Sequence, residues 1–156
     1  MDLSLSDSQV LIRDSVRTFV QRHVPRAELV RQAGAGQAWD PAWHALFAEA
    51  GWTGALVPAS CGGLELDPLS AALIFEELGR GAVPSPLLAS SAISVGLLLG
   101  CEDSEPRDGA LTAIADGTMI LIPALRRPAS SWKGVAATCS PLVDGVLTGA
   151  KVFVPF

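Results

Sequence analysis

Apolar residues recur at helical spacing through most of the first 116 residues. Ser6 and Gln9 form a capping box, which predicts a helix beginning directly after Ser6. The apolar positions that continue this helix are Ile12, Val16, Phe19 and Val20. The helix is predicted to end near Val24-Pro25, and the glycine-containing stretch from Arg31 to Ala38 is predicted to be a loop.

Two Asp-Pro pairs, Asp40-Pro41 and Asp67-Pro68, predict two further helix starts, because aspartate caps a helix and proline suits its first position. The first of these helices is expected to end at Gly51 and the second at Gly79. Between them, Trp52 to Val57 is predicted to be a short extended run. Trp43 and Trp52 are expected in the core. Gly62-Gly63 is expected to form a turn.

A fourth helix is predicted from Ser85-Pro86 to Gly100, and it is apolar on nearly every face. Helices of that kind are usually buried on all sides, so burial is expected here. A short fifth helix is predicted from Ser104 to about Ala115.

After Asp116-Gly117 the pattern changes to β-type runs, with Asp144-Gly145 as a tight-turn signal. The predicted runs are Thr118 to Leu125, Gly134 to Cys139, Val143 to Leu147 and Lys151 to Val154. The predicted fold class is therefore α+β: an all-α helical bundle over residues 1–116, followed by an incomplete antiparallel β-domain over residues 117–156. An unfinished β-domain is expected because the last apolar strand has no closing element after it.

Composition narrows the possible partners. The chain is 49% hydrophobic and 17% charged with a net charge of −5, which argues against a nucleic-acid partner. No apolar stretch is long enough to span a membrane. Three scattered cysteines predict reduced thiols in a cytoplasmic protein, and neither histidine has a partner at metal-ligand spacing, so no metal site is expected. Such a high share of apolar residues, with so few charges, indicates a core completed by another domain or another copy.

Four segments, in order, resemble the acyl-CoA dehydrogenase family. Leu3 to Val20 resembles its opening helix, and Phe75 to Arg80 is similar to its "EELGR" helix end. The other two resemblances are Gly51 to Pro58 with Cys61 to Leu64, for a helix-connecting loop, and Leu147 to Pro155, for the strand "L-x-G-x-K-x-(W/F)-(I/V)". The resemblance implies a flavoprotein oxidoreductase of lipid metabolism that acts on an acyl-CoA and forms oligomers.

In this family a glutamate removes the α-proton of the acyl-CoA thioester, and the β-hydrogen leaves as hydride to FAD. That glutamate belongs to a C-terminal domain, so no catalytic residue is expected in this chain. Glu76-Glu77 is interpreted as a solvated helix face. The small side chains of Ala89 to Ser94 leave room for a bulky acyl group, or else allow close helix packing.

The resemblance also implies flavin contacts at a segment of the form "(V/L)-T-E-P-G-x-G-S-D". Aligned on Pro128, Arg126 stands in place of the threonine and Arg127 in place of the glutamate. Phe153 matches an aromatic residue against the flavin, and Pro155 stands where many members have a hydroxyl residue. The predicted cofactor-binding residues are Leu125, Arg126, Ser130, Ser131, Phe153 and Pro155. These departures predict weakened binding of FAD.

Three hypotheses follow. The chain is part of a flavin-dependent acyl-CoA dehydrogenase and inactive alone; or it belongs to a non-catalytic subunit paired with an unlike acyl-CoA dehydrogenase subunit; or it is a helical interaction module. Pairs of unlike subunits occur in the family, and such a pair tolerates a weakened flavin motif in one partner. The protein is therefore expected to form a homo- or hetero-oligomer with acyl-CoA dehydrogenase-like subunits.

Overall fold

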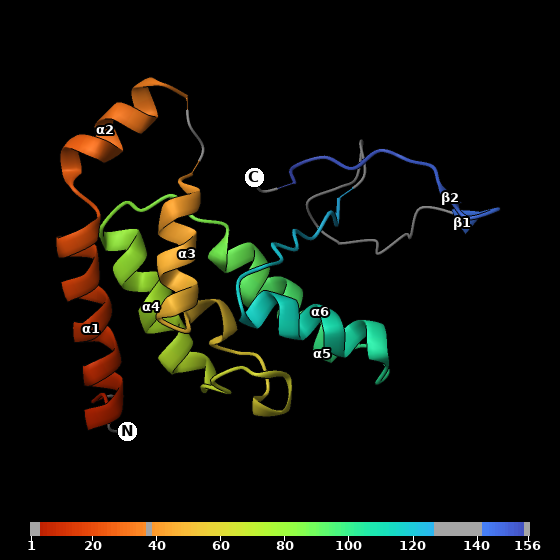
Figure 1. Ribbon diagram of the computed structural model, residues 1–156, viewed down its shortest axis with the longest axis horizontal. Coiled ribbons are helices and arrows are strands. Elements are labelled where there is room, and N and C mark those ends of the chain that lie inside the picture. The colour runs from red at the N-terminus through yellow and green to blue at the C-terminus, as the bar shows by residue number, and fades with distance from the viewer. Residues whose placement is uncertain (1–3, 37–38, 127–141, 155–156) are drawn as a thin grey trace.

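The computed structural model describes residues 4–36, 39–126 and 142–154. Helices form one body, and the C-terminal segment projects from it (Figure 1). The elements in chain order are α1 (Asp7–His23), α2 (Arg26–Gly34), α3 (Pro41–Glu49), the 3₁₀ turns η1 (Trp52–Gly54) and η2 (Ala59–Cys61), α4 (Pro68–Arg80), the π-helical η3 (Leu88–Ser94), α5 (Val95–Leu99), α6 (Glu105–Ala115), β1 (Leu142–Val143) and β2 (Val146–Leu147). None of the helices in these described ranges is long and apolar enough to cross a membrane.

The predicted helix caps are confirmed. In α1 the Gln9 amide donates to Ser6 Oγ over 3.3 Å, and the Ser6 amide donates to Gln9 Oε1 over 3.0 Å. Asp40 and Asp67 each accept backbone N–H groups at the starts of α3 and α4. These bonds satisfy donors that have no partner inside a helix, so the capping residues fix where the helices begin.

Two clusters of buried apolar side chains hold the helices together. The first lies between α1, α3 and α4, and it includes the predicted core residues Trp43 and Trp52. There the ring of Phe47 stacks on Trp52 with centroids 5.6 Å apart. The second cluster joins α5 and α6 to the loop after η1 and includes Val95 and Leu111.

An ion pair joins α1 to α4 at the edge of the first cluster. Arg17 Nη2 donates to Glu77 Oε1 over 2.7 Å and Arg17 Nε donates to Oε2 over 3.0 Å. Glu77 is only 2% exposed. The interpretation of Glu76-Glu77 as a solvated face is therefore wrong for Glu77 and right only for Glu76, whose side chain is 59% exposed.

Two local predictions between residues 26 and 63 are wrong. The expected loop from Arg31 to Ala38 begins inside α2, where Arg31 Nε donates to Glu28 Oε2 over 2.8 Å along the helix. The expected extended run from Trp52 begins as the 3₁₀ turn η1, entered through the left-handed Gly51 at φ +76°. The turn at Gly62-Gly63 is confirmed, and a Cβ on Gly63 would lie 2.1 Å from the Val57 carbonyl oxygen.

The fourth helix differs from its prediction in geometry and in burial. It has a π-helical start, η3, followed by α5. Its inner face is buried, but its outer face exposes a row of large apolar side chains: Leu88, Ile93, Leu97 and Leu99. A uniformly apolar sequence predicts that all faces of a helix are buried. It does not show which of these faces pack against other parts of the same chain.

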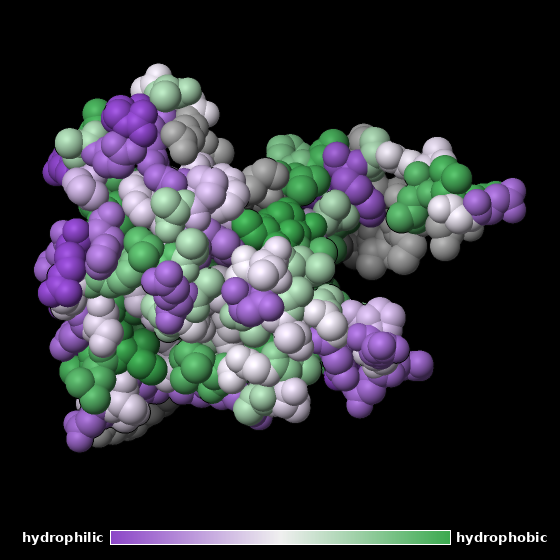
Figure 2. All heavy atoms as spheres, viewed as in Figure 1, coloured by the Kyte–Doolittle hydropathy of each residue, from purple (hydrophilic) through white to green (hydrophobic). Residues whose placement is uncertain are grey.

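The C-terminal segment is less regular than predicted. Asp144-Gly145 forms the expected tight turn with both residues at positive φ, and it joins β1 and β2 in an antiparallel hairpin. Thr118 to Leu125 contains no strand, and within Lys151 to Val154 only Val152 pairs, in an isolated bridge with Arg126. The run from Gly134 to Cys139 lies outside the described residues. An antiparallel β-domain is thus not confirmed, and Figure 2 shows apolar side chains along this projecting segment.

Replacing Glu77 with glutamine is expected to destabilise the helical body. The amide keeps the shape but loses the charge that Arg17 and Arg80 face. We expect a loss of about 1–2 kcal/mol in the free energy of unfolding at pH 7, less than the roughly 3–5 kcal/mol for fully buried pairs, because Arg17 is partly exposed. Urea unfolding followed by tryptophan fluorescence measures this loss. Glu76→Gln, one residue away and exposed, is the matched control and should change stability by less than about 0.5 kcal/mol.

The same pair of proteins tests the sign of the pH dependence. Hydrogen bonding from Arg17 lowers the pKa of Glu77 in the folded chain, against the opposing effect of burial. The charge of Glu77 therefore stabilises the fold fully above its unfolded pKa of about 4.3, and this stabilisation is lost as pH falls through the lower folded value. The stability gap between wild type and Glu77→Gln should narrow below pH 4; a gap that widens there contradicts the assignment.

Candidate functional site

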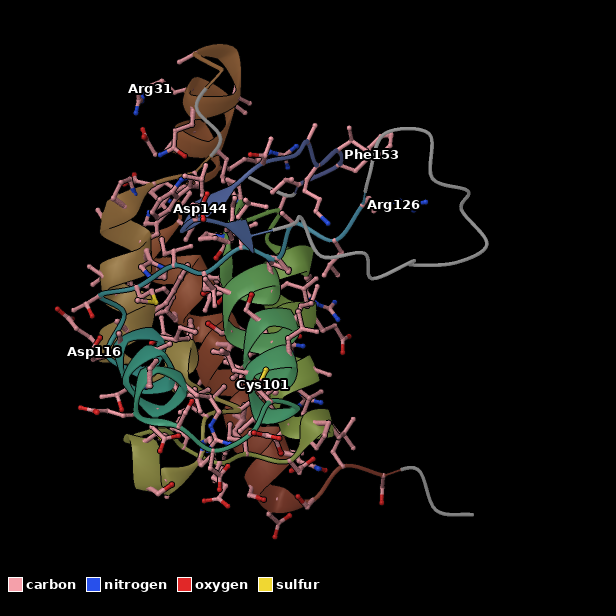
Figure 3. The ribbon with its side chains drawn as sticks, turned by 90° about the vertical axis from the view of Figure 1, so that its right-hand side faces the viewer. Arg31, Cys101, Asp116, Arg126, Asp144 and Phe153 are labelled. Carbon is pink, nitrogen blue, oxygen red and sulfur yellow. The ribbon has the colours of Figure 1, made fainter. Side chains whose placement is uncertain are left out.

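The structure brings together two segments for which cofactor contacts are predicted. The Val152 amide donates to the Arg126 carbonyl over 2.9 Å, across a separation of 26 residues in the sequence. This bridge places Leu125 and Arg126 beside Phe153, and Figure 3 shows Arg126 and Phe153 at the same end of the molecule. The other predicted contacts, Ser130, Ser131 and Pro155, lie outside the described residues.

Phe153 is exposed to solvent and not buried. Its side chain is 73% exposed, and its backbone adopts φ +54°, which is unusual for a bulky residue. An exposed aromatic ring near an arginine suits a flat ligand that carries negative charge. FAD is such a ligand, so the described part of the site fits the cofactor that the resemblance implies.

Two serines on the inner face of η3 hold the segment that leads to Arg126. The Leu121 amide donates to Ser90 Oγ over 3.1 Å, and Ser94 Oγ donates to the Leu121 carbonyl over 2.8 Å. Both backbone groups of Leu121 are thereby satisfied, although it belongs to no strand. This role was not predicted from the sequence, where its only signal is a group of serines inside an apolar run.

The buried face of η3 agrees with close helix packing at Ala89 to Ser94. Ala89, Ser90, Ser91 and Ser94 are all at most 4% exposed. Ser91 Oγ has no hydrogen-bond partner within the described part of the chain. The π-helical geometry places three serines on one buried face, and π-helical turns are frequent at functional sites.

Other chemistry-bearing residues form no site among the residues that the structure describes. No group of three His, Cys, Asp or Glu side chains there could hold a metal ion. His44 is buried against Trp39, with ring centroids 5.7 Å apart, and burial lowers its pKa although the nearby Gly117 backbone opposes the shift. Neither of its ring nitrogens makes a hydrogen bond of good geometry within the described ranges. These contacts support the interpretation of His44 as a neutral histidine of the core.

Replacing Ser90 with alanine is expected to loosen Leu121. The variant removes the acceptor of the Leu121 amide, and an unsatisfied amide costs about 1 kcal/mol, so this amide should exchange roughly fivefold faster. Hydrogen–deuterium exchange of the peptide containing Leu121 measures the change. Ser91→Ala is the matched control, because Ser91 Oγ has no partner in the described region. Equal acceleration in both variants would show that the Ser90 bond does not hold this segment.

The fold matches known structures over nearly the whole chain. A chain in the structure of the electron-transferring flavoprotein of Acidaminococcus fermentans superposes with a TM-score of 0.80 at 27% identity, over 99% of this chain and 41% of that one. The acyl-CoA dehydrogenase of Bacillus anthracis, solved with FAD, gives 0.67 at 26% identity over 82% of this chain and 22% of its own. The ChsE4-ChsE5 complex of Mycobacterium tuberculosis gives 0.77 at 18% identity over 99% and 40%, a likeness in fold alone.

Sequence comparison points the same way. The acyl-CoA dehydrogenase IpdE2 of Mycolicibacterium smegmatis is 31% identical over 118 residues, which are 74% of this chain and 36% of that protein. The chain thus spans about a third of the length of the curated relatives it matches. The family model for the acyl-CoA dehydrogenase N-terminal domain matches residues 6–118. The chain belongs to the acyl-CoA dehydrogenase family, of which it carries the N-terminal domain.

Proposed function

We propose that this chain is part of a flavin-dependent acyl-CoA dehydrogenase that introduces a 2,3 double bond into an acyl-CoA thioester. The family match and the FAD-bound relative of Bacillus anthracis support this reaction class. The observation that carries the proposal is the Arg126–Val152 bridge, which joins the two segments to which the resemblance assigns flavin contacts. FAD, when bound, supplies the hydride acceptor.

The proposal assigns the helical body and the C-terminal segment different roles. The helical domain, residues 1–116, forms one side of the acyl-CoA site, and residues 117–156 begin the β-domain that holds the cofactor. The family match ends at residue 118, close to this division. Leu125, Arg126, Ser130, Ser131, Phe153 and Pro155 are the proposed cofactor-binding residues. Among the described residues Cys61 and Cys101 are free thiols, which suits the cytoplasmic location that we propose.

No residue of this chain is proposed as the catalytic base. A base needs a pKa near the working pH and reach to the substrate. The carboxylate of Glu77 meets neither condition, because Arg17 and Arg80 hold it inside the helical body and lower its pKa. We therefore propose that these 156 residues alone do not oxidise an acyl-CoA. The helical interaction module is the alternative for a chain that binds neither cofactor nor substrate.

A pairing of unlike subunits is the second proposed function. Arg126 and Arg127 replace a threonine and a glutamate of the family pattern, and Pro155 offers neither a hydroxyl nor an N–H group. The fold recurs in the ChsE4-ChsE5 complex, so it is compatible with assembly from two differently named chains. In such a pair this subunit could share a flavin site with its partner or serve without one.

The visible spectrum of the full-length protein tests these alternatives. Flavin absorption bands at about 450 nm in the protein purified alone support a complete cofactor site in this subunit. Bands that are present only after co-purification with the product of an adjacent gene support a shared site. A colourless protein in both preparations contradicts the flavoprotein proposal and leaves the interaction module.

Replacing Arg126 with threonine restores the residue that the family pattern has there. In the full-length protein the added hydroxyl should tighten FAD binding by about threefold to tenfold, the effect of one hydrogen bond. The Arg126 carbonyl that accepts from Val152 belongs to the backbone and is kept. Fluorescence titration with FAD measures the affinity, and Arg22→Thr, on the exposed side of α1, controls for the lost charge. Weaker binding in Arg126→Thr would show that the guanidinium contributes more to FAD binding than the threonine hydroxyl that replaces it, and would contradict the predicted gain.

A further inference from the structure

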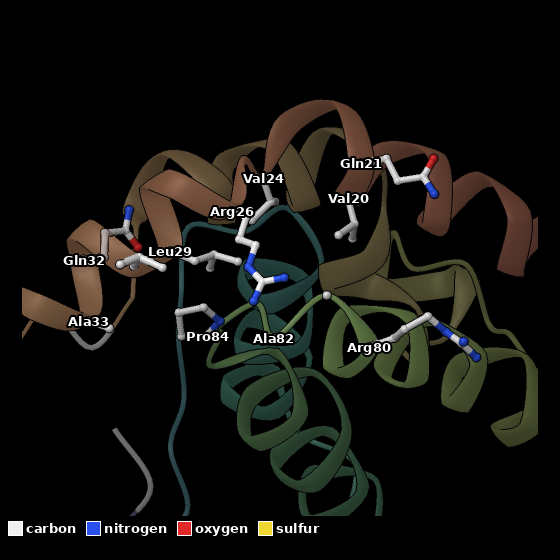
Figure 4. Close-up of a pocket in the computed structure, with 12 residues that line it drawn as sticks. Val20, Gln21, Val24, Arg26, Leu29, Gln32, Ala33, Arg80, Ala82 and Pro84 are labelled. Atoms are coloured by element: carbon white, nitrogen blue, oxygen red, sulfur yellow. The ribbon is translucent and has the colours of Figure 1, made fainter.

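A groove separate from the predicted cofactor residues lies where α1 ends, between α2 and the end of α4 (Figure 4). Its cavity volume is about 790 Å³, within the roughly 300–1,000 Å³ of small-molecule sites. The lining residues are Val20, Gln21, Val24, Arg26, Leu29, Val30, Gln32, Ala33, Arg80, Gly81, Ala82 and Pro84. Most of them are apolar, two are arginines and none is acidic.

The two arginines differ in how they are engaged. Arg80 contacts the carboxylates of Glu76 and Glu77 from its own helix. Arg26, at the start of α2, makes no hydrogen bond or ion pair with any residue that the structure describes. Figure 4 shows its guanidinium extended over the groove toward Ala82 and Pro84. The groove therefore presents one uncommitted positive charge on an apolar floor.

Gln32 gives an independent sign that the groove is a built site. Its side chain is 1% exposed, and its Nε2 donates to Glu28 Oε1 over 3.0 Å and to Asp40 Oδ2 over 2.9 Å. These two carboxylates fix the orientation of the amide, because only the nitrogen can donate to both. The Oε1 atom is left without a partner in the described part of the chain, and in Figure 4 it lies on the side of Leu29. A buried acceptor of this kind is rarely left unpaired.

We propose that this groove binds a small amphipathic carboxylate, one with an apolar chain and a hydrogen-bond donor near its head. The carboxylate pairs with Arg26, the chain lies along Val20, Val24 and Leu29, and the donor reaches Gln32 Oε1. Arginine suits this task because its planar guanidinium holds a carboxylate with two parallel hydrogen bonds. The groove contains none of the proposed flavin contacts, so a test of binding here is independent of the dehydrogenase proposal.

Calorimetric titration of the full-length protein with four probes that share a ten-carbon chain tests the chemistry of the groove. 3-Hydroxydecanoate carries both the charge and the donor, decanoate the charge alone, decanol a hydroxyl donor without the charge, and decyltrimethylammonium the opposite charge. All four are used below the concentrations at which they form micelles. We expect the hydroxy acid to bind best, decanoate next, decanol at least tenfold more weakly than decanoate, and the cation not at all.

Three variants locate the binding. Arg26→Gln should weaken both acids at least tenfold and leave decanol unchanged, whereas Arg22→Gln, an exposed arginine outside this groove, should leave all four probes unchanged. Ala33→Phe places a ring in the groove from an exposed position and should abolish binding while the melting temperature is kept. No binding of either acid to the wild-type protein, or equal affinity in Arg26→Gln, would overturn the proposal.

Discussion

The carboxylate of Glu77 is the constraint on which the arrangement of α1 and α4 depends. A carboxylate that is 2% exposed cannot stay charged without partners, because leaving it unpaired would cost several kcal/mol. Arg17 provides two hydrogen bonds from α1, and Arg80 adds its charge from one turn further along α4. A buried pair of this kind does more to set register than to add stability, since apolar residues of the same size could stabilise the contact equally well. Sliding α1 along α4 would break both hydrogen bonds at once.

The same register places the walls of the groove. Val20 follows Arg17 on α1 and Val24 caps the end of that helix, while Gly81 and Ala82 follow directly after α4. A Cβ on Gly81 would lie 2.4 Å from Val20 Cγ1, so the two helix ends meet too closely for any other residue there. The ion pair and this close approach together hold the groove open on the side where α2 turns away. The cavity is thus a consequence of how the helices pair, and it does not depend on the C-terminal segment.

Local signals in the sequence predicted what local contacts determine. The caps at Ser6, Asp40 and Asp67 depend on residues two or three positions away, so they can be predicted from the sequence alone. The burial of Trp43 and Trp52 was also predictable, because each ring carries a large apolar area. The burial of Glu77 was not, because it depends on Arg17, 60 residues earlier. Within the candidate site, the motif positions came from family resemblance, whereas the serine bonds to Leu121 required the fold.

The fourth helix shows why a pattern of apolar residues can mislead when a chain is only part of what it packs with. Its inner face gives polar atoms to Leu121, and its outer face leaves Leu88, Ile93 and Leu97 between 43% and 55% exposed. Apolar area in contact with water costs roughly 25 cal/mol per Å², so such a row favours any surface that covers it. The high apolar content of the chain predicts a core completed by another domain or another copy, and this face is where such a surface would pack. The same helix therefore carries both the exposed apolar row and the two serines that bind Leu121, which lies five residues before Arg126.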